Sequence, residues 1–148
     1  MQSCFNSKLE IMPCILLVLK ATSRAMSDMR LAGLIHLTVN AKAYNLSKRN
    51  LNGDYLFAKG EFEARWKLVQ AALKDLCLQE LVRIQVDKTG FVYSISQLDL
   101  DLINSINEQY LDMFYEQILA VNERVAHLSD SKISDLVTIG TMTRREQR

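Results

Sequence analysis

The segment from residue 60 to about residue 128 constrains the fold most, because it predicts a helix, a tight hairpin and a long second helix in immediate succession. Along 61–79, apolar residues recur at alternating gaps of four and three, which gives a helix one apolar face. Two short runs follow at 81–86 and 91–96, both rich in β-branched and aromatic residues. Gly90 lies between them and can adopt the positive φ that ends a short turn.

A helix that leads directly into a hairpin is typical of a winged-helix domain. We therefore expect a mainly α fold with a small two-stranded β wing and a long C-terminal helix from about Leu98 to about Leu128. The runs 81–86 and 91–96 should pair antiparallel about residues 87–90. The expected core of the wing junction consists of Trp66, Val69, Leu73, Val82 and Ile84.

The sequence of 148 residues suggests one domain, and its single Pro and five Gly favour helices. Residues 1–10 are expected to be a flexible N-terminus, 11–129 the winged-helix domain and 130–148 a C-terminal extension or polar tail. Pro13 suits the first turn of a helix that continues to about Thr22. Ser27 is the expected N-cap of a second helix that ends near Val39.

Composition argues against several classes of function. The net charge is +1, from 18 basic and 17 acidic residues, so no broad field attracts nucleic acid or an acidic membrane. The apolar run at 11–19 is too short to cross a bilayer. Three Cys is an odd number, and Cys14 and Cys77 lie in apolar helical patterns, which indicates buried reduced thiols in a cytoplasmic protein.

No catalytic, cofactor-binding or metal-binding motif is present in the sequence. There is no P-loop, no Gly-rich dinucleotide turn and no nucleophile elbow. No Cys pair has ligand spacing, and His36 and His127 are far apart, which disfavours zinc. We interpret His36 as a partly buried, hydrogen-bonded side chain rather than a catalytic one. The sequence thus predicts no enzyme, no cofactor and no metal.

The last helix carries more large apolar residues than one buried face can hold. The surplus predicts a surface where a second protein packs, since aromatic residues and Met are enriched in the cores of interfaces. The alternative, equally compatible with the pattern, is that the first two helices wrap this helix completely. The candidate interface residues are Tyr110, Leu111, Met113, Phe114, Tyr115, Ile118 and Leu119.

The segment between about residues 40 and 59 is rich in turn formers and in basic residues. One interpretation is a basic loop that contacts phosphate or an acidic surface of a partner. The other, which we favour, is an exposed loop whose charges are simply solvated. The basic residues are Lys42, Lys48, Arg49 and Lys59.

The helix that would read DNA in a winged-helix protein begins Glu61-Phe62-Glu63. Carboxylates repel phosphates at the position where such a helix enters the major groove. We therefore expect weak binding to duplex DNA without sequence preference, and a role in protein contact.

The motifs of this region are Gly-Glu-Phe-Glu-Ala-Arg-Trp-Lys-Leu-Val at 60–69, Ala-Leu-Lys-Asp-Leu at 72–76, Glu-Leu-Val at 80–82 and Gly-Phe-Val-Tyr at 90–93. Over about residues 27–128 the chain resembles the small middle component of bacterial ABC-three-component defence systems, including the Lamassu type. Those winged-helix proteins have a Gly-Glu element at the start of the helix, an Arg within it and Leu-Val at the entry to the wing. Many have Gly before that Leu-Val, whereas Glu80 stands here, which puts the turn into the wing in question.

The resemblance implies a non-catalytic accessory subunit of an anti-phage or anti-plasmid complex. Such a subunit would bridge or regulate an SMC/Rad50-like ABC ATPase and an effector, often a nuclease, in a hetero-oligomer that meets DNA weakly or only through the complex. The alternative is a dimeric winged-helix DNA-binding transcription regulator, which sequence-specific DNA binding and a symmetric dimer would favour. A small hydrolase is disfavoured for want of a site.

Overall fold

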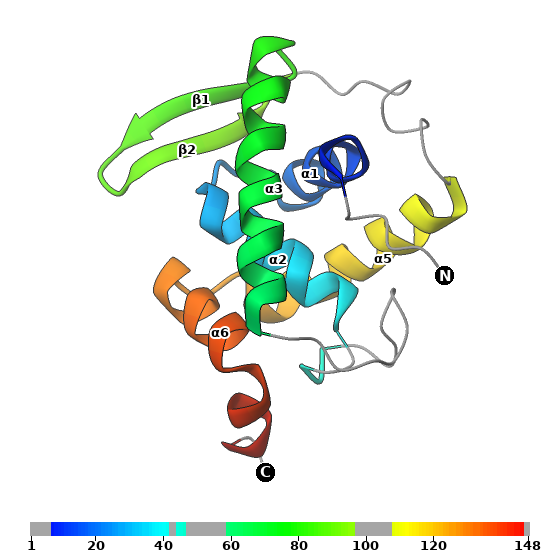
Figure 1. Ribbon diagram of the computed structural model, residues 1–148, viewed down its shortest axis with the longest axis vertical. Coiled ribbons are helices and arrows are strands. Elements are labelled where there is room, and N and C mark those ends of the chain that lie inside the picture. Colours follow the sequence, from blue (N-terminus) through cyan, green and yellow to red (C-terminus); the bar gives the residue numbers. More distant parts are fainter. Residues whose placement is uncertain (1–6, 42–43, 47–58, 97–107, 147–148) are drawn as a thin grey trace.

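The computed structural model describes residues 7–41, 44–46, 59–96 and 108–146 (Figure 1). Helices surround the core, and one hairpin projects away from them beside the end of α3. The expected class, mainly α with a small two-stranded β wing, is confirmed. In order, the elements are α1 (Lys8–Thr22), α2 (Asp28–Val39), α3 (Lys59–Leu78), β1 (Val82–Asp87), β2 (Gly90–Ile95), α5 (Glu108–Val125) and α6 (Asp130–Glu146).

Helix α1 begins earlier than the predicted start near Pro13. Ser7 caps the helix, because its side chain accepts a hydrogen bond from the backbone N–H of Glu10 and donates one to the Glu10 carboxylate, at 3.3 and 3.0 Å. This N-cap starts the helix at Lys8, so that Pro13 lies inside the helix and not in its first turn. Residues 8–10, which were expected to belong to the N-terminal segment before the domain, form the first turn of α1. The helix is buried on nearly every side, as its composition predicted.

Helix α2 is the central helix of the core, in contact with α1, α3, α5 and α6. Ser27 caps it as predicted, because its hydroxyl accepts the N–H of Arg30 at 3.1 Å, and the helix ends at Val39. Gly33 allows α6 to approach closely, since a Cβ at that position would lie 2.6 Å from a methyl carbon of Ile133. The glycine therefore has a packing role that offsets its low helix propensity.

The wing forms as expected, with β1 and β2 paired antiparallel from Val82–Ile95 to Asp87–Gly90. Gly90 has a φ of 123°, which suits glycine. The Asp87 carboxylate accepts hydrogen bonds from the backbone N–H and the hydroxyl of Thr89, at 2.8 and 2.7 Å, and these bonds hold the pKa of Asp87 below its usual value. The tight turn is thus closed by side-chain as well as backbone bonds.

The prediction that Ile84 belongs to the core of the wing junction is wrong. Val69, Leu73 and Val82 are buried and Trp66 is partly buried, but Ile84 is 47% exposed. After Val82, the strand β1 leaves the helices, and its remaining residues extend into solvent.

The turn from α3 into β1 is a Schellman motif that places Glu80 in the left-handed region, at a φ of 63°. The N–H of Leu81 bonds the carbonyl of Leu76, and the N–H of Glu80 bonds that of Cys77, each at 3.0 Å. Glycine adopts this conformation without strain, so the turn keeps the geometry that suits Gly although the residue is Glu.

Substituting Glu80→Gly should therefore raise the free energy of unfolding by about 0.5–1 kcal/mol, because the strain of a non-glycine residue with positive φ is removed. Urea unfolding followed by circular dichroism measures the change. The neighbouring Gln79→Gly is the matched control and should give no gain, because Gln79 has no positive φ. Equal effects of the two substitutions would mean that Glu80 carries no strain.

The C-terminal part of the chain differs from expectation. A helix over 98–128 was predicted, and α5 covers 108–125, while 98–107 lies outside the described residues. Most of the segment expected to be a C-terminal extension or polar tail forms α6, which packs on α2 and α3. Ile133 and Val137 are four residues apart and both enter the core, and the Ser129 hydroxyl caps the helix through the N–H of Lys132. Ser129 and this short apolar repeat were the sequence signal for the helix.

Candidate partner-binding surface

The candidate interface residues of α5 divide into a buried and an accessible group. Leu111, Phe114 and Ile118 are at most 3% exposed, because they belong to the stripe of α5 that faces α1 and α2. They pack into the core beneath the accessible residues of α5. The accessible members are Leu119, which is 42% exposed, and the partly buried Tyr110, Met113 and Tyr115.

A groove runs between α1 and α5, and Tyr115 of the accessible group lines it. Its volume is about 370 Å³, and its lining combines apolar Leu17 and Leu111 with charged side chains. The Lys20 ammonium of α1 lies 5.4 Å from the centroid of the Tyr115 ring of α5, a cation–π contact that joins the two helices across the groove. The remaining lining residues are Asp112 and Glu116, both exposed.

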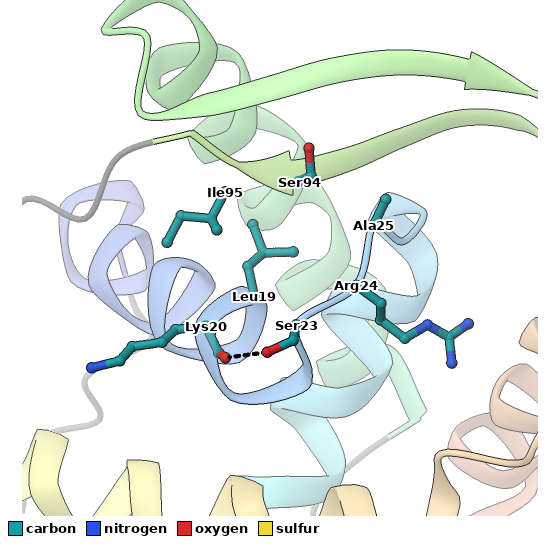
Figure 2. A pocket seen from close by; sticks show the side chains of 7 residues that line it. All are labelled: Leu19, Lys20, Ser23, Arg24, Ala25, Ser94 and Ile95. Carbon is teal, nitrogen blue, oxygen red and sulfur yellow. Dashed lines mark hydrogen bonds between the residues drawn. The ribbon is translucent and has the colours of Figure 1, made fainter.

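A second groove lies on the other side of Lys20, between the end of α1 and β2 (Figure 2). Figure 2 shows Leu19 and Ile95 converging in its floor, while the side chains of Lys20 and Arg24 point away in opposite directions. Its volume is about 440 Å³. The Ser23 hydroxyl donates to the backbone carbonyl of Lys20 at 3.3 Å. The groove thus offers apolar contact with a basic rim.

The basic contact loop proposed from sequence falls mostly outside the described residues. This applies to Lys42, Lys48 and Arg49, and for Lys59 only the backbone is described, as the first residue of α3. The proposal of a basic contact loop therefore stays a prediction.

A buried polar cluster joins α2 to α3. One guanidinium nitrogen of Arg65 lies 2.8 Å from His36 Nδ1, and the other lies 3.3 Å from the Glu61 carboxylate. Arginine only donates, so Nδ1 accepts and the neutral imidazole carries its proton on Nε2. Burial, and then the charge of Arg65, lower the pKa of His36 to about 3.

His36 is hydrogen-bonded as expected, but it is fully buried and not partly buried. Glu61 and Arg65 are four residues apart, a spacing that commonly gives an ion pair on the surface of a helix, but Arg65 is only 5% exposed. The pair lies deeper because the guanidinium reaches inward to His36. The neutral imidazole is shielded between the aromatic rings of Tyr44 and Phe62, which indicates a structural role.

The described part of the chain holds neither a metal-binding cluster nor a membrane-spanning helix. Among residues 7–41, 44–46, 59–96 and 108–146, no group of three His, Cys, Asp or Glu side chains is placed to hold a metal ion. Within the same ranges no helix is long and apolar enough to cross a membrane. The Cys14 thiol is buried and donates to the backbone carbonyl of Glu10 at 3.8 Å, and burial raises the pKa of Cys77.

The exposed side of α3, where a DNA-reading helix would act, has mixed charge. Glu63, Lys67 and Lys74 are exposed there, and the amide of Gln70 is engaged by donating to the Asp28 carboxylate at 3.0 Å. This composition gives the described part of α3 no continuous basic stripe.

Together, these observations define a small helical module with a β wing, whose described surface offers grooves for protein contact. The family model for ABC-three component (ABC-3C) system Middle Component 2 matches residues 4–145. The chain therefore belongs to the Middle Component 2 family of ABC-three component systems, and a middle component implies partner subunits. Comparison with curated proteins and with solved structures gave no match.

Proposed function

We propose that this protein is a non-catalytic accessory subunit of a cytoplasmic, Lamassu-type anti-phage or anti-plasmid complex. In that role it bridges or regulates an SMC/Rad50-like ABC ATPase and an effector nuclease. Membership of the Middle Component 2 family supports the presence of partner subunits. The ATP site would belong to the ATPase, which is consistent with the lack of a P-loop in this sequence.

The proposal includes a winged-helix arrangement. Support comes from the order of elements and from one bridge in the connection between α1 and α2. Met26 pairs with Tyr93 of β2 through two backbone hydrogen bonds of 3.0 and 2.8 Å, so that this connection borders the wing as a third strand position. A winged-helix topology requires this order of elements: a helix, a bridge, two helices and a hairpin.

The observation that carries the proposal is the groove between α1 and α5 with exposed Leu119 beside it. Leu119 follows Tyr115 by one helical turn, so both side chains lie on the same side of α5. An apolar side chain of a partner would contact Leu17 and Leu119, and a basic one would reach Asp112 and Glu116 on the rim. An apolar centre with a charged rim is the usual composition of such an interface.

The substitution Leu119→Asp should reduce the recovery of the other two subunits in a tagged co-purification by at least about tenfold. A carboxylate in a desolvated apolar contact costs more than the 1.4 kcal/mol that corresponds to a factor of ten. The isolated variant should keep its melting temperature, because Leu119 is 42% exposed.

Leu78→Asp is the matched control. Leu78 is an exposed leucine at the end of α3, does not line the groove and receives the same substitution. It should co-purify as the wild type does. If both variants retain the partners equally, the groove between α1 and α5 is not the interface.

A further inference from the structure

The strand β1 forms an edge of the wing, and its backbone bonding pattern is fixed by its neighbours. Tyr93 bonds to Met26, so its backbone groups point away from β1. Because bonded and non-bonded pairs alternate along an antiparallel ladder, the partner of Tyr93, Ile84, also directs its N–H and carbonyl outward. The same holds for Val82 and Val86, two residues before and after Ile84.

This edge is open to solvent. Every residue of β1 after Val82 is exposed, and three large apolar side chains lie on one face of the projecting hairpin: Ile84, Val86 and Phe91 are 47, 72 and 62% exposed. Figure 1 shows the hairpin extending beyond the helices. Natural edge strands are usually protected by charged side chains, by Pro, by a bulge or by short length. Strand β1 has six regularly paired residues without Pro, and its two charged residues, Arg83 and Asp87, are of opposite sign.

The sequence of β1 is complementary to itself. We propose that two copies of this chain associate through β1, antiparallel, about a two-fold axis at Gln85, to form a continuous four-stranded sheet. In that register Ile84 faces Val86 of the second copy. Both residues direct their backbone groups outward, so the two equivalent pairs form four hydrogen bonds between the chains.

Charge selects this register. With the axis at Gln85, Arg83 lies opposite Asp87 of the second copy, twice by symmetry. An axis at Ile84 would place Arg83 opposite Gln85, and an axis at Val86 would place Gln85 opposite Asp87. Among these three registers, which all use the outward-pointing groups of β1, only the one at Gln85 pairs opposite charges.

The apolar face of the wing becomes continuous in the same arrangement. Across the four strands, one row of side chains begins with Tyr93 and Ile84 of one copy and continues with Val86 and Phe91 of the other. The two-fold axis places a second, identical row beside the first. Aromatic and β-branched neighbours across strands favour each other. The contact is smaller than a standard protein interface, so we expect a dimer in the micromolar range. It uses the wing alone and leaves the groove between α1 and α5 free for other subunits.

Sedimentation velocity of the full chain across the micromolar range tests the proposal. The wild type should show a monomer–dimer equilibrium. Arg83→Glu and Asp87→Lys should each weaken self-association by at least about tenfold, because like charges then face each other twice. An equimolar mixture of the two variants should recover the dimer, since every facing pair again carries opposite charges.

Arg124→Glu is the control for charge alone, because Arg124 is exposed on α5, away from the wing, and its substitution changes the net charge equally. It should dimerise as the wild type does.

A wild type that stays monomeric, an Arg83→Glu variant that dimerises normally, or a mixture that fails to recover would each overturn the proposal. Loss of the dimer on Leu119→Asp instead would assign self-association to α5. Loss of another subunit on Arg83→Glu, with a monomeric wild type, would assign the edge to a strand of that subunit.

Discussion

Replacing Arg30 with Met should lower the free energy of unfolding by about 3–5 kcal/mol, the range expected when one partner of a buried charged network is removed. Arg30 is 1% exposed. Its guanidinium donates to the backbone carbonyls of Leu128, Val125 and Ala126 at 2.7, 3.3 and 3.3 Å, and to the Asp130 carboxylate at 3.0 Å.

The effect is large because these acceptors lie at the junction of two helices. The carbonyls belong to the end of α5 and the turn after it, where partners within the helix are not available. The Val125 carbonyl accepts the N–H of Leu128 at 3.0 Å in addition to the Arg30 guanidinium. A cation at this position also complements the negative end of the helix dipole. Asp130, which begins α6, is held in addition by the Ser27 hydroxyl at 2.8 Å. Arg30 thus ties the first turn of α2 to the connection between α5 and α6, and Met would fill the volume without bonding these groups.

Urea unfolding monitored by circular dichroism measures the loss. Arg24→Met is the matched control, since Arg24 is exposed and makes a single 3.4 Å hydrogen bond to the carbonyl of Ala126. Surface substitutions of this kind usually change stability by less than about 0.5 kcal/mol. Similar losses in the two variants would show that water satisfies the α5 carbonyls when Arg30 is removed.

The parts of the fold that local sequence determines were predictable. The alternating runs and Gly90 specify the wing, and Ser27 marks the start of α2, because these features act over a few residues of chain. The positive φ of Glu80 shows that the turn into the wing is imposed by packing of Leu76 and Leu81, since the residue itself disfavours that conformation. Helix α6 was missed because its apolar repeat is short, and its stability depends on packing against Gly33.

The buried charges were not predictable from local pattern. Nothing in the local sequence distinguishes Arg30 and Arg65 from ordinary surface residues. Their hydrogen-bond acceptors lie far away along the chain, at separations of about 95–100 residues for Arg30 and 29 residues for the contact of Arg65 with His36. The candidate surface on α5 was predicted in part for the same reason. The excess of apolar residues located it on the correct helix, but which members stay accessible depends on how α1 and α2 cover α5.

The stability of the protein should fall as the pH is lowered from about 6.5 towards 4, because of His36. Its pKa is about 3 in the folded protein, against 6.5 for an unperturbed histidine. Between these values the unfolded chain binds a proton at His36 and the folded chain does not, so protons favour unfolding. The contribution of neutral His36 is complete above pH 6.5 and decreases by about 1.4 kcal/mol for each pH unit below roughly 6.

Chemical unfolding at a series of pH values between 7 and about 4 measures this slope for the wild type and for His36→Gln. Glutamine keeps an acceptor for the 2.8 Å contact with Arg65 and does not titrate, so the variant should lack the histidine part of the slope. His127→Gln is the control, because the second histidine of the sequence is exposed, and its substitution should leave the slope unchanged. If wild type and His36→Gln lose stability in parallel, His36 accepts a proton in the folded state, and the burial and Arg65 contact do not hold it neutral.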